Sequence, residues 1–231
     1  MNLLVLCPSR SRPWGALDAY QSFLSTKERH DTSMVFVVDE DDDKLGSYKH
    51  LELPLYILPP QGGMVAALNT AALHYADDAQ YIGFIGDDHR FRTPGWDAAF
   101  TRALDANGGG LAYGNDLFWP QGQIPTQIFM SSSIIRALGW MGLPSCKHLY
   151  IDNVWKVLGD STDSLFYFPR YVIEHLHPAA GKAEWDAQYL RLNSEERYAA
   201  DRAAFEAWMA TQASEDCERV RSALTGPSVA G

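Results

Sequence analysis

Four short apolar runs alternate with segments of helical spacing in the first half of the chain. The runs lie at 3–7, 34–38, 55–58 and 81–85, and apolar residues recur at helical spacing within 14–27, 64–75 and 96–104. This alternation predicts βαβ units, and therefore an α/β domain with a mainly parallel central sheet flanked by helices. Because the runs are almost continuously apolar, we expect both faces of the sheet to be covered.

The second half of the chain has a less regular pattern. We expect a weak strand at 111–114, a loop at 118–125, a strand and then a helix within 129–139, a helix at 150–158, and strands at 166–168 and 171–177. A near-continuous helix is predicted from 194 to 224, with two acidic residues in its favourable first turn. We therefore divide the chain into a domain of residues 1–185 and a C-terminal helical extension of residues 186–231.

The composition narrows the class of protein. The chain of 231 residues has a formal net charge of −10, whereas proteins that grip duplex nucleic acid usually present a basic surface. Its three cysteines, Cys7, Cys146 and Cys217, show no metal-ligand spacing and are expected to be reduced thiols. No apolar run reaches the roughly 18 residues typical of a membrane span, so we expect no membrane partner and a cytoplasmic protein.

A pair of acids, Asp87 and Asp88, closes the fourth apolar run. Two adjacent carboxylates after a buried strand are costly unless a positive group lies beside them, and carboxylate oxygens suit Mg²⁺ or Mn²⁺. The alternative is an acidic turn in which Asp88 caps a helix. On the strand predicted at 171–177, His175 and His177 point to the same face, and imidazole is a common metal ligand. Hydrogen-bonded surface histidines are the alternative interpretation.

Polar residues also follow the first two strands. Ser9, Arg10 and Arg12 come after the first, and an arginine fork matches a phosphate edge, although a solvated loop is an equally simple interpretation. Asp39 follows the second strand, where an acid can bind ribose hydroxyls or a base edge, or belong to an ordinary acidic loop. Ligands of parallel sheets bind outside the carboxyl ends of the strands, where these residues gather.

Further candidates are less specific. Gly62 and Gly63 precede a predicted helix, where backbone amides could approach a phosphate, although their spacing matches neither a P-loop nor GxGxxG. Asn69 within that helix could face a nucleotide or form local hydrogen bonds. Lys182 could meet a phosphate as a point charge.

An isolated acid, Asp152, lies among Tyr, Trp and Leu residues. A carboxylate in such surroundings has a raised pKa and can act as a general base, and an aspartate there can also cap a helix. Trp119, Trp140 and Trp155 could stack against an acceptor, or pack in the core.

These pieces, in this order, resemble the GT-A fold glycosyltransferases, especially the small family 2-like members of bacteria and phages. The resemblance covers residues 1–185 and rests on the segment from Cys7 and Pro8 to Arg10, on Asp39, on Gly62 and Gly63 with Asn69, on the turn at 84–88, on Asp152 and on the segment from His175 to His177. It implies a single Rossmann-like GT-A domain, with a nucleotide-binding half at about 1–105 and an acceptor half at about 106–185. It also implies Mn²⁺ or Mg²⁺ bound to the diphosphate of a nucleotide sugar, a UDP- or GDP-sugar above all.

The resemblance assigns roles to individual residues. Asp88 resembles the metal ligand of a DxD-type motif, and Asp87 the residue nearer ribose or sugar. Gly86 stands where the family has its first acid, unless Asp87, Asp88 and His89 form the triplet. A histidine on a late strand completes the metal shell, with His177 slightly favoured over His175 because Gly181 and Lys182 follow it.

The remaining roles concern the two substrates. The donor side is implied for Pro8, Ser9, Arg10, Arg12, Asp39, Gly62, Gly63, Asn69 and Lys182. Asp152 resembles the base of inverting members, which implies direct displacement by an acceptor hydroxyl, although retaining enzymes look alike at this level. Trp119 and Trp155 are the expected acceptor platforms.

Two other functions compete with this interpretation. A nucleotidyltransferase would also use paired acids, but it usually has a glycine-rich basic loop after the first strand, where this chain has only Gly15. A non-catalytic GT-A-like binding module stays open because the motif is incomplete. The acceptor could be a glycan, a nucleobase, a protein or a small metabolite, and a homo-oligomer is possible. For a phage-type protein, the expected location is the host cytoplasm.

Overall fold

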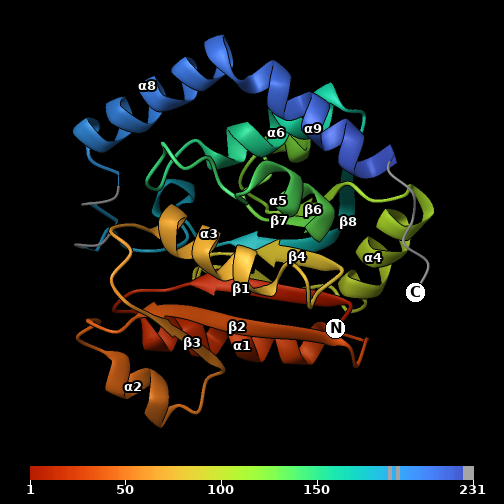
Figure 1. The fold of residues 1–231 in the computed structure, drawn as a ribbon. Coiled ribbons are helices and arrows are strands. Elements are labelled where there is room, and N and C mark those ends of the chain that lie inside the picture. The colour runs from red at the N-terminus through yellow and green to blue at the C-terminus, as the bar shows by residue number, and fades with distance from the viewer. Residues whose placement is uncertain (187–188, 191–192, 226–231) are drawn as a thin grey trace.

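The computed structural model describes residues 1–186, 189–190 and 193–225. An eight-stranded sheet, in the order β3-β2-β1-β4-β7-β6-β8-β5, forms the centre of these residues (Figure 1). The strands are β1 (Leu3–Pro8), β2 (Thr32–Asp39), β3 (Leu55–Leu58), β4 (Tyr81–Phe84), β5 (His89–Phe91), β6 (Leu111–Asn115), β7 (Ile128–Ser131) and β8 (Leu165–His175).

The first four strands in the sheet order run parallel to one another. β1 pairs in parallel with both β2 and β4, and β2 pairs in parallel with β3. Beyond β4 the sheet changes direction: β7 is antiparallel to β4 and β6, β6 is parallel to β8, and β5 is antiparallel to β8. The predicted α/β class with a mainly parallel sheet is therefore confirmed, and the carboxyl ends of β1, β2 and β4 meet at one edge.

Helices cover both faces of the sheet. α1 (Pro13–Thr26) and α4 (Trp96–Ala106) contribute to one apolar core, and α3 (Met64–Tyr75), α5 (Ser132–Leu138) and α6 (Ile151–Ser161) contribute to the other. Side chains of β1 alternate between the two cores, with Leu3 and Val5 in one and Leu4 and Leu6 in the other. This alternation follows from the two-residue repeat of a strand and explains why the run is apolar throughout.

Two helices follow the sheet, α8 (Glu195–Thr211) and α9 (Ala213–Thr225), and lie across α5 and α6 (Figure 1). The helix predicted over 194–224 is thus broken at Gln212. Trp208, Cys217 and Val220 join the core beside α3, α5 and α6, so the two helices pack onto the domain. The boundary predicted at 185/186 stays a prediction, and residues 187–188, 191–192 and 226–231 of the predicted extension lie outside the described residues.

The structure contains elements that the sequence pattern did not show. The segments 166–168 and 171–177 were predicted as two strands, but β8 is continuous through Pro169, near the place where its register with β6 shifts. A proline is tolerated at such an irregularity because no ladder hydrogen bond is needed from it. Short elements also escaped prediction, namely α2 (Leu45–His50), β5, and the 3-10 helices η1 (Pro120–Gly122) and η2 (Pro178–Ala180).

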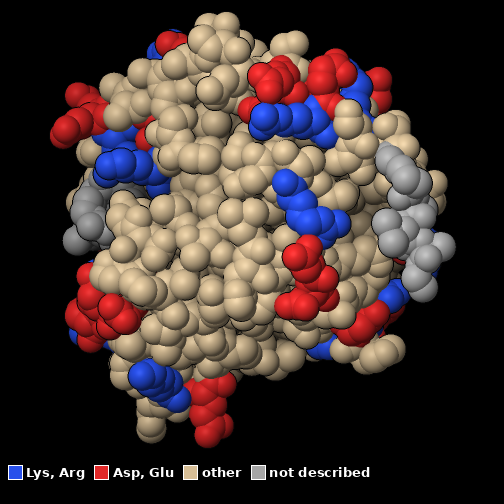
Figure 2. Space-filling model, viewed as in Figure 1, with Lys and Arg blue, Asp and Glu red and all other residues tan. Residues whose placement is uncertain are grey.

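The cysteines, the helices and the surface charges can be compared with the expectations from composition. The three cysteines are free and buried, as predicted. Within the described residues, none of the helices combines the length and the apolar character that crossing a bilayer requires. On the face drawn in Figure 2, basic side chains lie beside acidic ones rather than forming a broad basic patch.

Packing at the centre of the sheet gives a stability prediction. A Cβ added at Gly83 of β4 would overlap the buried ring of Phe129 on β7, whereas a Cβ at Gly46 of α2 would meet no atom within 4 Å. Gly83→Ala should therefore lower the free energy of unfolding by about 1–3 kcal/mol, as overpacked cores do. Gly46→Ala, the matched control, should leave it unchanged or raise it by up to about 1 kcal/mol. Urea denaturation measures both, and equal effects would contradict the packing argument.

Candidate functional site

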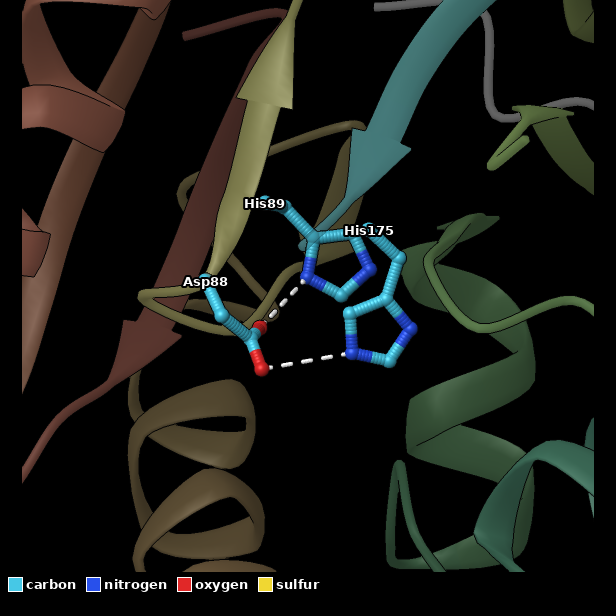
Figure 3. A group of neighbouring side chains, drawn as sticks. All are labelled: Asp88, His89 and His175. Carbon is cyan, nitrogen blue, oxygen red and sulfur yellow. Dashed lines mark hydrogen bonds and ion pairs between the residues drawn. The ribbon is translucent and has the colours of Figure 1, made fainter. Parts of the chain in front are cut away.

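Asp88, His89 and His175 form a cluster at the carboxyl end of β4 (Figure 3). Asp88 lies in the turn after β4, His89 begins β5, and His175 ends β8. The pairing of β5 with β8 places the two histidines opposite each other, and their rings stack with centroids 4.3 Å apart. Potential ligand atoms of the three residues lie within 4.8 Å of one another, which is a separation that a single cation can bridge.

The hydrogen bonding of the cluster suits a positive charge at its centre. The Asp88 carboxylate reaches both rings, with Oδ1 3.0 Å from His89 Nδ1 and Oδ2 3.2 Å from His175 Nε2. His89 Nδ1 also accepts the Gly86 N–H at 3.1 Å, which leaves that nitrogen no proton to offer Asp88. His89 Nε2 and His175 Nδ1 are buried without a partner among the described residues. Two acceptor atoms, Asp88 Oδ1 and His89 Nδ1, thus lie 3.0 Å apart, an arrangement that a bound cation would stabilise.

The charges of the cluster shift its pKa values in opposite directions. Burial, joined by the charge of His175, lowers the pKa of His89, which favours the neutral imidazole that can bind metal. Burial also acts to lower the pKa of His175, but the Asp88 carboxylate outweighs it and raises that pKa. Burial acts to raise the pKa of Asp88, yet His175 and His89 hold it well below its usual range. Asp88 is therefore a carboxylate at neutral pH.

Asp87 occupies a different environment from its neighbour. Its Oδ2 accepts a hydrogen bond from Ser9 Oγ at 2.7 Å, and Ser9 Oγ lies 2.7 Å from the Tyr48 hydroxyl. Arg12 Nη1 lies 3.5 Å from Asp87 Oδ1. Burial, with the adjacent charge of Asp88, raises the pKa of Asp87 to about 6 in spite of these partners. Ser9, predicted on the donor side, thus orients Asp87 from beneath the site.

A cavity of about 430 Å³ opens beside the cluster. Its lining includes Arg12, Trp14, Asp88, Lys182, Asp186 and Tyr189. The Tyr189 hydroxyl donates to Asp88 Oδ2 at 2.8 Å, and the Arg12 guanidinium lies 4.0 Å from the centre of the Tyr189 ring. Arg12 Nη2 also donates to both carboxylate oxygens of Asp186, at 2.7 and 2.6 Å. Arg12 therefore already holds a carboxylate in the way that it would hold an anionic ligand.

The two histidines of the predicted pair lie close together, with ring centroids 5.2 Å apart, but they have different partners. His177 Nδ1 accepts the Ala179 N–H at 3.1 Å, and its ring stacks on Phe118 with centroids 5.4 Å apart. His177 is not part of the group formed by Asp88, His89 and His175, and the slight preference for it as a metal ligand stays a prediction. His175, together with His89, contacts the Asp88 carboxylate. Lys182 lines the cavity while its Nζ pairs with Glu174 Oε1 at 2.9 Å.

Other residues predicted on the donor side fall into two groups. Arg10 Nη1 contacts Asp39 Oδ2 at 2.9 Å at the ends of β1 and β2, and Asp39 Oδ1 is buried without a partner among the described residues. Asn69 is corrected to a structural role, because its amide accepts the N–H groups of Met141 and Gly142 and donates to the Gly142 carbonyl.

The remaining donor candidates are backbone positions. Pro8 ends β1, directly before Ser9. Gly62 has the left-handed φ of +77°, which favours glycine, and Gly63 stands at the N-terminus of α3 against the Lys147 carbonyl. Their approach to a phosphate stays a prediction.

The residues predicted on the acceptor side differ in how buried they are. Asp152 lies in the first turn of α6, where its Oδ1 accepts the Asn153 N–H at 2.9 Å, and burial raises its pKa. Trp119 is 39% exposed beside Phe118, as a platform requires. Trp155 is corrected to a core residue, since it is 0% exposed and its Nε1 donates to the Met141 carbonyl. Trp140 is buried as well.

Several residues of the site were not singled out from the sequence. Tyr48 lies in the unpredicted helix α2. Tyr189 lies 101 positions after its partner Asp88 in the sequence. Asp116 anchors the loop that carries Trp119 by accepting the N–H groups of Phe118 and Trp119. An aspartate in a loop often accepts the N–H group of the residue two positions later, which forms a turn. This preference could have identified Asp116 from the sequence.

Comparison with solved structures shows which known fold the chain has. The chain matches S. aureus TarS (residues 1–349) with a TM-score of 0.60 and 12% identity, over 93% of this chain and 73% of that one. It matches the mannosyltransferase PcManGT from Pyrobaculum calidifontis, solved with GDP-Man and Mn²⁺, with a TM-score of 0.57 and 13% identity over 100% and 76% of the chains. The chain has the GT-A fold.

A third structure extends the comparison. Glucosyl-3-phosphoglycerate synthase from Mycobacterium tuberculosis, solved with Mn²⁺, UDP-Glc and phosphoglyceric acid, gives a TM-score of 0.61 at 11% identity, over 88% of this chain and 79% of that one. No family model and no curated relative matches the sequence. At these identities the GT-A fold predicted from the sequence is confirmed, and the activity has to be argued from the site.

The environment of Asp87 predicts a pH dependence of stability. Its pKa rises from 3.8 to about 6 on folding, so its stabilising contribution is complete below pH 3.8 and is lost as the pH rises through about 6. The Asp87→Asn side chain cannot ionise. We therefore expect the free energy of unfolding of the variant minus that of the unmutated protein, both measured in EDTA, to increase by about 2 kcal/mol from pH 4.5 to pH 7.5. Urea denaturation at both pH values measures this, and a difference independent of pH would contradict the assignment.

Proposed function

We propose that this protein is a metal-dependent glycosyltransferase that moves a sugar from a nucleotide-sugar donor to an acceptor hydroxyl. The observation that carries the proposal is the cluster of Asp88, His89 and His175 at the carboxyl end of β4, within a GT-A fold. Ligands of such sheets bind at this edge. The neighbouring mannosyltransferase and glucosyl-3-phosphoglycerate synthase were solved with Mn²⁺ and a nucleotide sugar, which supports the same class of ligands here.

The donor set of the cluster fits a divalent cation. One carboxylate and two imidazoles make a mixed oxygen and nitrogen site. Such a site suits Mn²⁺ and is less favourable for Mg²⁺, which prefers oxygen ligands. When bound, the cation would neutralise charge on the diphosphate of the donor. We therefore expect Mn²⁺ or Mg²⁺ as the cofactor, with Mn²⁺ the better fit.

Neighbouring side chains would hold the rest of the donor. Arg12, whose Nη2 now donates to both oxygens of the Asp186 carboxylate, can bind the diphosphate, and Lys182 in the cavity lining can add a second positive charge. Asp39 offers a buried oxygen without a partner, which suits a ribose hydroxyl or a base edge. Asp87, held by Ser9 and 3.5 Å from Arg12 Nη1, lines the same cavity. A UDP- or GDP-sugar fits this arrangement.

The transfer itself would depend on Asp152. Its carboxylate takes the proton of the acceptor hydroxyl, the acceptor oxygen forms a bond to the anomeric carbon, and the bond from that carbon to the diphosphate oxygen breaks. Burial raises the pKa of Asp152, which makes it a stronger base than an exposed aspartate. Trp119, on the loop that Asp116 anchors, offers exposed aromatic surface for an acceptor.

Removal of the central carboxylate tests the metal site. Asp88→Ala should abolish the thermal stabilisation that a nucleoside diphosphate gives in the presence of Mn²⁺, because the two histidines lose the anionic ligand between them. Thermal unfolding is measured with UDP, GDP, CDP and ADP, each with and without Mn²⁺. Asp77→Ala, an exposed acid paired with Arg136, is the control and should keep the full shift. A protein that shows no metal-dependent shift with any nucleotide would refute the glycosyltransferase proposal.

Substitution of the base separates binding from transfer. Asp152→Asn should keep the Mn²⁺-dependent stabilisation by nucleotide but reduce product formation by about 10²–10⁴-fold, the usual contribution of a general base. Mass spectrometry of acceptor mixtures incubated with a library of nucleotide sugars measures the product. Asp160→Asn, an acid on the same helix that pairs with Lys156, should transfer at the normal rate. Full turnover by Asp152→Asn would show that another group is the base.

A further inference from the structure

We propose that Asp201 of α8 is a positioning residue for the acceptor side of the site, so that the C-terminal helices form part of the transfer machinery. The inference rests on the proposed function, because it concerns the segment that leads into Asp152. Asp201 is 2% exposed, although it lies on a helix whose other residues are mostly solvated. A buried carboxylate is costly unless it is hydrogen-bonded, so its partners are informative.

Those partners are three consecutive backbone amides of one loop. Asp201 Oδ1 accepts the Lys147 N–H at 3.0 Å, and Oδ2 accepts the N–H groups of His148 at 3.0 Å and Leu149 at 2.8 Å. The carbonyl of Asp201 also lies 3.7 Å from Cys146 Sγ. Three charge-assisted hydrogen bonds from one side chain fix the path of a loop that has no regular secondary structure of its own.

Aromatic packing continues the same contact toward α6. Tyr150, which directly precedes that helix, stacks against Phe205 of α8 with ring centroids 5.6 Å apart and meets Tyr198 edge-on at 5.3 Å. Tyr150 has a left-handed φ of 66°, a strained conformation for a residue with a side chain, and the packing on α8 holds it there. α6 begins at the next residue, so α8 sets the point at which Asp152 enters the first helical turn.

The loop also carries a histidine toward the site. His148 Nδ1 is buried without a partner among the described residues. Burial lowers the pKa of His148 to about 4, and the charges of Asp88, Asp201 and Arg12 act on the ring. The imidazole is therefore neutral at physiological pH. By fixing residues 147–149, Asp201 positions both this ring and Asp152.

The experiment compares two buried acids of the C-terminal helices. Asp201→Asn keeps the size of the side chain but places an amide NH₂ against at least one of the three N–H donors. Asp216→Asn is the matched control, since Asp216 is also buried and joins α8 to α9 through Trp208 Nε1, at 2.9 Å, without contacting the loop. Turnover of UDP-glucose and GDP-mannose with Mn²⁺ is followed by release of the nucleoside diphosphate, and amide hydrogen exchange is followed at residues 147–149.

The expected result is a split between kcat and KM. Asp201→Asn should lower kcat at least about tenfold with an unchanged KM for the donor, because misplacement of a catalytic group slows the chemical step without weakening donor binding. Exchange at 147–149 should quicken at least about tenfold in this variant, and Asp216→Asn should change neither quantity. Tyr198→Ala removes an exposed ring from the contact with Tyr150 and should lower kcat by a smaller factor, again at unchanged KM. This variant tests the inference if Asp201→Asn fails to fold.

Opposite outcomes separate this inference from the proposed function. Equal kcat in the two Asn variants, or exchange at 147–149 no faster in Asp201→Asn than in Asp216→Asn, overturns the positioning role. If the unmutated protein turns over neither donor but exchange at 147–149 still quickens only in Asp201→Asn, the loop is held as inferred and the proposed function is the part that fails.

Discussion

Two adjacent acids at the end of a buried strand impose an electrostatic constraint that the surrounding structure must meet. Asp87 and Asp88 repel each other, and burial makes the charged form of each more costly. The structure treats them differently. Asp87 receives Ser9 and Arg12 and still has a raised pKa, whereas Asp88 receives two histidines and Tyr189 and stays charged. This difference in environment decides which acid is available to a cation.

The constraint also explains why distant segments meet at this point. β1 supplies the serine and arginine because it is parallel to β4, so that both strands end at the same edge. β8 supplies His175 because it pairs with β5, the three residues that follow the acids. Because β7 is antiparallel to both β4 and β6, β6 and β8 run in the direction of β4, and the carboxyl end of β8 brings His175 to the edge where the acids lie.

The location of the site could be predicted from the sequence, but several of its contacts could not. The near-continuous apolar runs fixed the parallel core, and polar residues at strand ends marked the edge where Asp39, Asp87 and Asp88 lie. β5 is too short to show a periodicity, so the opposition of His89 and His175 could not be seen. Trp155 and Asn69 match a binding pattern by residue type, yet their polar atoms are used by the backbone of residues 141–142.

Backbone hydrogen bonds offer a physical way to divide the acids of this chain by role. Asp97 accepts the N–H groups of Glu28 and Arg29, Asp116 those of Phe118 and Trp119, and Asp201 those of three loop residues. Each of these buried acids uses its oxygens to hold a segment of chain in place. The net charge of −10 therefore reflects structural anchors as well as any cation site.

The two acids assigned to chemistry differ from these anchors. Asp88 is bonded by side chains that can move or exchange a proton, two of them potential metal ligands. Asp152 accepts the neighbouring Asn153 N–H at Oδ1. Its Oδ2 accepts no hydrogen bond from the described residues. A carboxylate oxygen that no backbone amide occupies remains available to a cation or a hydroxyl. The sequence shows only that an aspartate is present, and the fold determines whether its lone pairs are already used.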